Sequence, residues 1–186
     1  MDIKKIIEQH LNVSQSLYDL ETDINEICKV CFECISRGNK ILLCGNGGSA
    51  ADSIHIAAEL VGKFETHRKS LPAIALSSNI SNITSIGNDF GFDQIFSRQI
   101  SSLGEKDDVL IALSTSGNSE NIIKAIESAK ENKMRLIVFT GSNGGVIAKN
   151  DDALVLKINS DNTARIQEMH ILVGHIICKY IDNYFQ

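Results

Sequence analysis

Short segments that are apolar throughout alternate with segments of helical periodicity along most of this chain. The apolar segments are only four to six residues long and lie at 40–44, 73–76, 109–113, 135–140 and 153–158. Strands of this kind are typical of parallel sheets, in which helices cover both faces and lead the chain from one strand to the next. The alternation therefore predicts a doubly wound α/β domain with a five-stranded parallel sheet.

Apolar residues at helical spacing predict the elements between the strands. The pattern at 3–36 breaks near residues 12–14, which predicts two helices or a kink, and residues 82–88 form a segment of mixed character. Further helices are predicted at 50–64, 90–103, 120–132, 145–149 and 163–184. We expect one domain over residues 1–186, in which the helical region 1–36 packs on the domain or on a partner subunit.

Composition excludes several classes of protein. The net charge of −5 argues against a broad basic surface for nucleic acid. No apolar run approaches the roughly 20 residues that cross a membrane, and residues 1–12 lack a signal-peptide core. We therefore expect a cytoplasmic protein. Its cysteines then read as free thiols, including the helical run 28, 31 and 34, which resembles a cluster-binding motif but has no fourth cysteine nearby.

A glycine-rich turn, Gly45–Ser49, follows the first predicted strand. With Ala50 it matches the pattern G-x-G-x-x-G/A of dinucleotide-binding turns. That reading is disfavoured because Ser77-Ser78-Asn79, after the second strand, offers no acid for a ribose. A tight turn without a ligand is one alternative. We favour a polar substrate that approaches the bare backbone that glycine leaves open.

Hydroxyl groups gather after the third predicted strand, in the segment Ser114–Ser119 that opens a helix. Helix N–H groups and hydroxyl donors together suit a phosphate. The simpler alternative is a helix cap by Ser116 or Asn118, which accounts for one polar residue but not for the whole run. Since ligands bind at the carboxyl ends of parallel strands, the glycine turn and this loop are expected to share one site.

Two predicted helices carry further candidate residues. Asp52, His55 and Glu59 share one helix face, where His55 and Glu59 are either a metal-binding pair or a surface contact. The terminal helix carries Gln167 and His175 among apolar residues, and both could simply be satisfied polar groups of a core or interface. They lie about 12 Å apart along the helix. They could bind one ion only with stretched side chains or from different subunits.

Four segments together resemble one family. CGNGGSAADSIHIAAEL, IGNDFGF, STSGNS and RIQEMHILVGH occur here in the order typical of the phosphoheptose isomerases of the sugar isomerase (SIS) family. The resemblance covers nearly the whole chain. It implies the SIS fold, a homotetramer, and conversion of sedoheptulose 7-phosphate to D-glycero-D-manno-heptose 7-phosphate for bacterial surface heptose synthesis.

The resemblance also implies roles for individual residues. Glu59 and His175 correspond to the family's acid/base pair, and Asp52 matches a polar position beside them. One zinc ion per subunit is implied, with ligands His55, Glu59, Gln167 and His175. The implied substrate-binding residues are Asn46, Gly47, Gly48, Ser49, Glu59, Asn88, Asp89, Ser114, Thr115, Ser116, Ser119 and Gln167.

Two positions depart from the pattern of some members, which carry Asp where Ala164 stands and Arg where Lys63 stands. A related replication regulator that binds DnaA shares the run Ala-Arg-Ile-Gln-Glu-Met-His but lacks a histidine at position 175. The presence of His175 favours the enzyme. A non-catalytic SIS-fold binding protein and an isomerase of another sugar phosphate remain the alternatives.

Apolar residues surround much of the terminal helix, more than one core-facing stripe needs. This surplus predicts burial against a second subunit and thus a homotetramer with active sites at subunit interfaces. The residues are Ile166, Met169, Ile171, Leu172, Val173, Ile176, Ile177 and Ile181.

Overall fold

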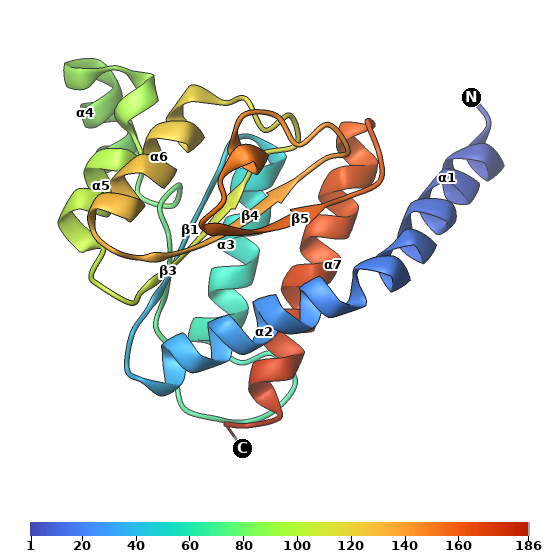
Figure 1. Ribbon diagram of the computed structural model, residues 1–186, viewed down its shortest axis with the longest axis horizontal. Helices are drawn as coiled ribbons and strands as arrows, with labels where there is room; N and C mark the ends of the chain where they lie inside the picture. The colour runs from blue at the N-terminus through green and yellow to red at the C-terminus, as the bar shows by residue number, and fades with distance from the viewer. Residues whose placement is uncertain (186) are drawn as a thin grey trace.

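A five-stranded parallel sheet forms the centre of the computed structural model, which describes residues 1–185 (Figure 1). The strand order is β2-β1-β3-β4-β5, and every neighbouring pair is parallel. The predicted sheet is confirmed, and two strands have the predicted bounds. The strands are β1 Ile41–Gly45, β2 Ala73–Ala75, β3 Val109–Leu113, β4 Arg135–Thr140 and β5 Ala153–Lys157.

Helices cover both faces of this sheet. On one face, α2 (Glu21–Ser36), α3 (Gly48–Val61) and α7 (Thr163–Asp182) pack on strand residues such as Leu43 and Ile111. On the other face, α5 (Ser97–Leu103) and α6 (Glu120–Glu131) pack on Leu42 and Leu110. Successive strand residues thus face opposite layers, as the pleat of a strand requires. Both layers are apolar, which explains why the strands lack alternating polarity.

The N-terminal region bends slightly later than predicted. Helix α1 (Ile3–Gln15) gives way to the 3-10 turn η1 (Ser16–Leu20), where Leu17 enters the core, and α2 follows. Figure 1 shows α1 projecting beyond the body of the domain. It contacts α7 through polar groups, with His10 Nδ1 2.8 Å from Glu168 Oε2. Most of its apolar residues, such as Ile3 and Leu11, are exposed, whereas Val13 is half-buried against the core.

The segment between β2 and β3 differs most from prediction. Residues predicted as mixed form a helix, α4 (Ile80–Phe90), because the Asn79 side chain caps it by accepting from Asn82 N–H. The prediction of a single helix at 90–103 is wrong. Gly91 has a φ of +100°, so the chain turns there before the short helix η2 (Phe92–Gln94) and α5. A short helix, η3 (Ile147–Lys149), lies within the predicted range 145–149.

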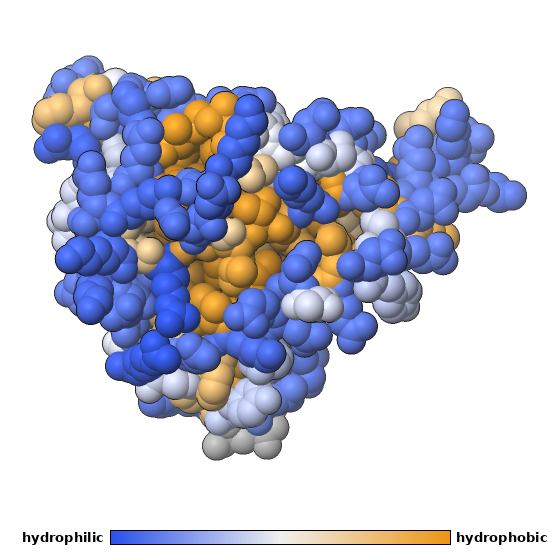
Figure 2. All heavy atoms as spheres, viewed as in Figure 1, coloured by the Kyte–Doolittle hydropathy of each residue, from blue (hydrophilic) through white to orange (hydrophobic). Residues whose placement is uncertain are grey.

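All five cysteines are buried free thiols, as predicted. Burial raises the pKa of the Cys28 thiol to about 11. Within residues 1–185, no helix combines the length and the apolar character that a membrane span needs. Figure 2 shows apolar side chains in the middle of one face, where the edge strand β5 leaves Ala153, Leu154 and Val155 half-buried.

Candidate active site

Two polar loops meet at one edge of the sheet, as predicted. The glycine turn follows β1 and the hydroxyl loop follows β3, and these strands are parallel neighbours. Asn46 of the glycine turn and Asn121, in the first turn of α6 just after the hydroxyl loop, form two side-chain hydrogen bonds of 2.8 Å each. The two loops can therefore contact one ligand at the carboxyl ends of the strands.

The hydroxyl loop opens α6 without capping it. Ser119 holds the N-cap position, and no side-chain hydrogen bond caps the helix. The alternative cap by Ser116 or Asn118 is thus wrong. Ser114 Oγ accepts from Gly117 N–H and lies 3.3 Å from Ser119 Oγ, while Ser116 Oγ accepts from Asn118 N–H. An uncapped helix start beside several hydroxyls is well suited to bind an anion.

The segment after β4, residues 141–147, packs against this loop. Gly117 has a φ of +67°, and a Cβ atom there would clash with the Gly144 carbonyl. Ile147 N–H donates to Gly117 O, and Val146 N–H donates to the Asn118 side chain. The position of the hydroxyl loop therefore depends on close contact between two loops that both require glycine.

Bare backbone lines the glycine turn. Gly47 has a φ of +55°, with open space where a side chain would project. A Cβ atom on Gly48 would lie 2.6 Å from the Gln167 side-chain amide, so Gln167 reaches from α7 to the start of α3. Ser49, predicted to bind substrate, is itself buried.

A second cluster lies further along α3. One ligand atom each of His55, Glu59 and His175 falls within 4.8 Å of the others. His55 Nε2 lies 3.1 Å from Glu59 Oε1, and the imidazole of His175 approaches that of His55 edge-on with centroids 5.0 Å apart. We call these three residues the trio. His175 Nε2 is buried and has no hydrogen-bond partner among the described residues.

Close helix packing assembles the trio within one chain. Gly48 lies against Gln167 and Ile56 against Gly174, so α3 and α7 run side by side in the same direction. A Cβ atom on Gly174 would lie 2.5 Å from Ile56 Cδ1. The absence of a side chain at this crossing lets the neighbouring His175 approach α3.

The fourth predicted zinc ligand, Gln167, lies apart from the trio in this chain. Gln167 contacts Gly48, which precedes Glu59 by eleven residues, or about 16 Å of helix. Of the two predicted alternatives, stretched side chains or different subunits, the second would therefore place only Gln167 on another subunit. His175 joins His55 and Glu59 of its own chain.

The remaining predicted residues are spread over the fold. Asp52 is half-buried with Oδ2 unpartnered among the described residues, and this burial raises the pKa of the carboxyl to about 6, against the influence of His55. Asn88 and Asp89 are exposed on α4, which Figure 1 shows at the opposite side of the molecule from α7. Lys63 and Ala164 are also exposed.

One neighbour of the trio was not predicted from the sequence. The ring of Phe64 stacks on the imidazole of His175 at 5.4 Å with an interplanar angle of 28°. Phe64 lies just after α3, where it reads as an ordinary apolar residue at a helix end. Only the packing of α7 on α3 gives it this position.

The doubly wound sheet, with a glycine turn and a hydroxyl loop at its strand ends, is the arrangement of an SIS domain. Residues 7–141 match the SIS domain family, and the chain belongs to that family. Among its relatives within that family are phosphoheptose isomerases. It is 48% identical to the phosphoheptose isomerase of a Nitratiruptor species over 98% of this chain and 97% of that protein.

Other relatives agree in sequence and structure. Phosphoheptose isomerase 1 of Campylobacter jejuni is 45% identical over 98% of both chains. A solved phosphoheptose isomerase from Francisella tularensis has a TM-score of 0.94 at 38% identity, covering 97% of this chain and 96% of that one. The enzyme from Neisseria gonorrhoeae has a TM-score of 0.92 at 41% identity, covering 97% of each.

Proposed function

We propose that this protein is a phosphoheptose isomerase that converts sedoheptulose 7-phosphate to D-glycero-D-manno-heptose 7-phosphate for heptose synthesis. The observation that carries the proposal is the trio, which places a carboxylate and two imidazoles together on one face of the SIS domain. The relatives that share nearly its full length carry the same enzyme name.

The reaction is a proton transfer between neighbouring carbon atoms. A base removes a proton from the carbon beside the carbonyl, an enediol(ate) forms, and a proton returns to the other carbon while the carbonyl and hydroxyl oxygens exchange roles. A carboxylate and an imidazole suit these two transfers. We assign them to Glu59 and His175, which lie within one cluster of ligand atoms.

Phosphate binding is assigned to the hydroxyl loop. Its hydroxyls and the uncapped start of α6 supply donors without a lysine. The glycine turn, joined to it through Asn46 and Asn121, would receive the sugar chain. The exposed Asn88 and Asp89 are then proposed to act on a substrate bound by a neighbouring subunit.

The trio fits a zinc ion. Two imidazoles and a carboxylate are common zinc ligands, and the unpartnered buried Nε2 of His175 is explained if it binds a metal. We propose one ion per subunit, held by His55, Glu59 and His175, with Gln167 of another subunit as the further ligand. When bound, zinc would supply positive charge for an enediolate oxygen. A lone pair of Glu59 or His175 that holds the ion could not accept a proton at the same time.

The separation along α3 supports active sites that are shared between subunits. The glycine turn and Glu59 lie at opposite ends of that helix, about 16 Å apart. This exceeds the length of a seven-carbon sugar phosphate, which favours a site that a second chain completes. Exposed apolar residues on α7, including Leu172 and Ile176, supply a surface for that chain. We propose a homotetramer in the cytoplasm, the compartment that the free thiols favour.

The direct test is turnover of sedoheptulose 7-phosphate with the product identified by NMR. We expect activity in the wild type and its loss, by roughly 10²–10⁴-fold, in Glu59→Gln and His175→Asn. His67→Asn, an exposed histidine outside the trio, is the control and should remain active. Absence of turnover with zinc supplied would instead favour a binding protein, and turnover of a different sugar phosphate would correct the substrate.

Metal content is tested separately. Elemental analysis of protein purified without chelator should find about one zinc per subunit, and His55→Gln should reduce it. The stability and activity of the metal-free protein then decide the role of the ion. A fully active metal-free enzyme would remove zinc from the reaction and leave Glu59 and His175 as free bases.

A further inference from the structure

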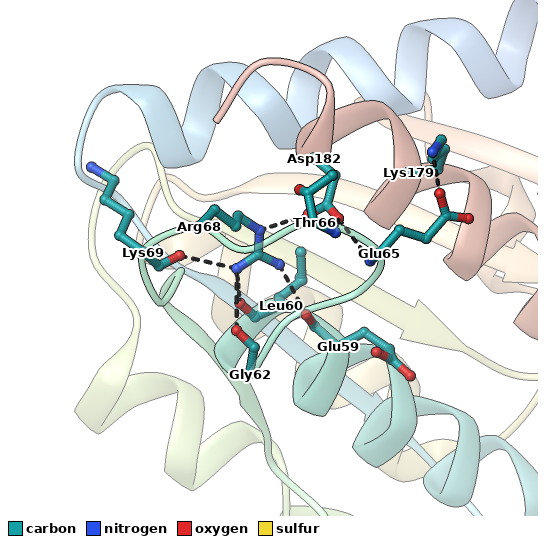
Figure 3. A network of polar contacts seen from close by, with 9 residues as sticks. All are labelled: Glu59, Leu60, Gly62, Glu65, Thr66, Arg68, Lys69, Lys179 and Asp182. Carbon is teal, nitrogen blue, oxygen red and sulfur yellow. Dashed lines mark hydrogen bonds and ion pairs between the residues drawn. The ribbon is translucent and has the colours of Figure 1, made fainter. Parts of the chain in front are cut away.

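A buried ion pair joins the ends of the two helices that carry the trio. Arg68 lies in the loop after α3, and Asp182 is the last residue of α7. Both side chains are fully buried, and Arg68 Nε donates to Asp182 Oδ1 at 2.6 Å (Figure 3). Removing one member of such a pair leaves an uncompensated buried charge, so the loss of either side chain should be strongly destabilising.

The guanidinium of Arg68 also caps the C-terminal end of α3. Its Nη2 donates to the carbonyl of Glu59 at 2.9 Å, and its Nη1 donates to that of Leu60 at 2.9 Å. The last carbonyls of a helix lack partners within the helix and carry partial negative charge, so a cation there is favourable. Arg68 therefore holds the main chain of a trio residue directly, as Figure 3 shows.

The carboxylate of Asp182 holds the same loop at a second place. Its Oδ2 accepts from the N–H groups of Glu65 and Thr66 at 2.9 and 3.0 Å. These residues directly follow Phe64, whose ring stacks on His175. Asp182 thus fixes Phe64 against the imidazole from a position two turns further along α7.

We propose that Arg68, Asp182 and Phe64 form a positioning clamp for the trio. Arg68 fixes the Glu59 main chain, and Asp182 fixes the loop whose Phe64 ring orients His175. None of the three touches a reacting atom, so they are positioning residues. The effect on turnover rests on the proposed function, whereas the effect on the His175 imidazole does not.

The chain offers a closely matched control in Asp108. Its carboxylate is also fully buried, and it accepts from the N–H groups of Lys40 and Glu105 and pairs with Lys40 Nζ at 2.7 Å. Like Asp182, it therefore binds two backbone donors and one cation, and it accepts one further hydrogen bond from the Asn39 side-chain amide at 3.2 Å. None of these partners lies on α3 or α7.

The test compares Asp182→Asn and Phe64→Leu with Asp108→Asn in the full-length protein. The first readout is the nuclear Overhauser contacts between the ring protons of His175 and His55 in metal-free protein by NMR, with the His175 signals assigned by their absence in His175→Asn. The second is kcat and KM for sedoheptulose 7-phosphate. Circular dichroism and urea unfolding establish that each variant folds and how much stability it loses. If Asp182→Asn does not fold, Phe64→Leu decides, because it keeps an apolar side chain in place.

We expect both clamp variants to change the contacts between the His175 and His55 rings and to lower kcat by about 10–100-fold with a smaller change in KM, as for residues that orient a site's ligands. Asp108→Asn should lose stability but keep these contacts and kcat. Unchanged contacts between the His175 and His55 rings in folded Phe64→Leu, or equal changes in Asp108→Asn, would overturn the clamp. If the wild type lacks turnover, the proposed function fails and the NMR comparison still judges the clamp.

Discussion

The two histidines of α7, His170 and His175, differ sharply in their surroundings. His170 is fully buried beside Phe139, with Nε2 3.4 Å from the Thr140 carbonyl and Nδ1 unpartnered among the described residues. Burial lowers its pKa to about 4, and the contact with Thr140 opposes this only in part. His170 is therefore a neutral core residue.

This burial predicts a loss of stability in acid. Between the unfolded pKa of about 6.5 and the folded pKa of about 4, the unfolded chain binds the proton that folded His170 rejects. The free energy of unfolding should therefore fall as pH falls through this range, by up to about 3 kcal/mol from His170 alone.

Urea unfolding of His170→Leu at several pH values tests this prediction. The variant should be less sensitive to acid than the wild type, because it has no group to protonate there. Thr140 O keeps a partner in Ile158 N–H. An equal decline of stability in both proteins would show that other groups cause the acid sensitivity.

Ser116 tests the phosphate assignment. Its side chain is exposed at the start of α6, and Ser116→Ala should raise KM about tenfold or more, the loss of one hydrogen bond to a charged group. Ser102→Ala, an exposed serine on α5, is the control. A crystal structure with phosphate should place the anion at residues 114–119. An anion bound only by the glycine turn would reverse the roles of the two loops.

At the scale of elements, glycine decides how the loops pack. Gly117 and Gly38 both have positive φ, so alanine at either site costs roughly 1–2 kcal/mol from backbone strain. Only at Gly117 would the new Cβ also collide with backbone, whereas Gly38 has open space around it. Gly117→Ala should therefore destabilise the protein more than Gly38→Ala.

Urea unfolding measures the stability difference, and KM measures its effect on the site. Gly117→Ala should weaken substrate binding because the hydroxyl loop must move away from Gly144. Gly38→Ala, between α2 and β1, should leave KM unchanged. Equal losses of stability in the two variants would mean that contact with Gly144 adds nothing to the strain.

At the scale of the whole molecule, the trio decides which mixture of inactive subunits can show whether active sites are shared between chains. Glu59 and His175 belong to one cluster in one chain, so mixing Glu59→Gln with His175→Asn should give no active site. A Glu59→Gln chain mixed with a Ser116→Asp chain should recover activity. The first supplies an intact hydroxyl loop, and the second supplies an intact trio.

Native mass spectrometry should confirm that mixed tetramers form. Recovery only in the second mixture supports sites built from two chains. Mixed assemblies that form and remain inactive in both mixtures would place each site within a single chain. A monomer at assay concentrations would contradict the proposed tetramer.

The sequence by itself determined the layers of this protein and the edge that carries its polar loops. Apolar runs such as 109–113 predict buried parallel strands because hydrophobic periodicity is a local property, and polar residues directly after them must lie at strand ends. The helix at 80–90 was not predicted because a side-chain cap at Asn79 outweighs its mixed pattern.

Only the tertiary structure decided which candidate residues meet. His175 joins His55 and Glu59, while Gln167, on the same helix, lies beside Gly48. The ion pair of Arg68 and Asp182 joins residues 114 positions apart in the sequence. The physical reason is that periodicity fixes the buried face of a helix, whereas side-chain contacts depend on how far and in which direction two helices slide past each other, here set by Gly174 against Ile56.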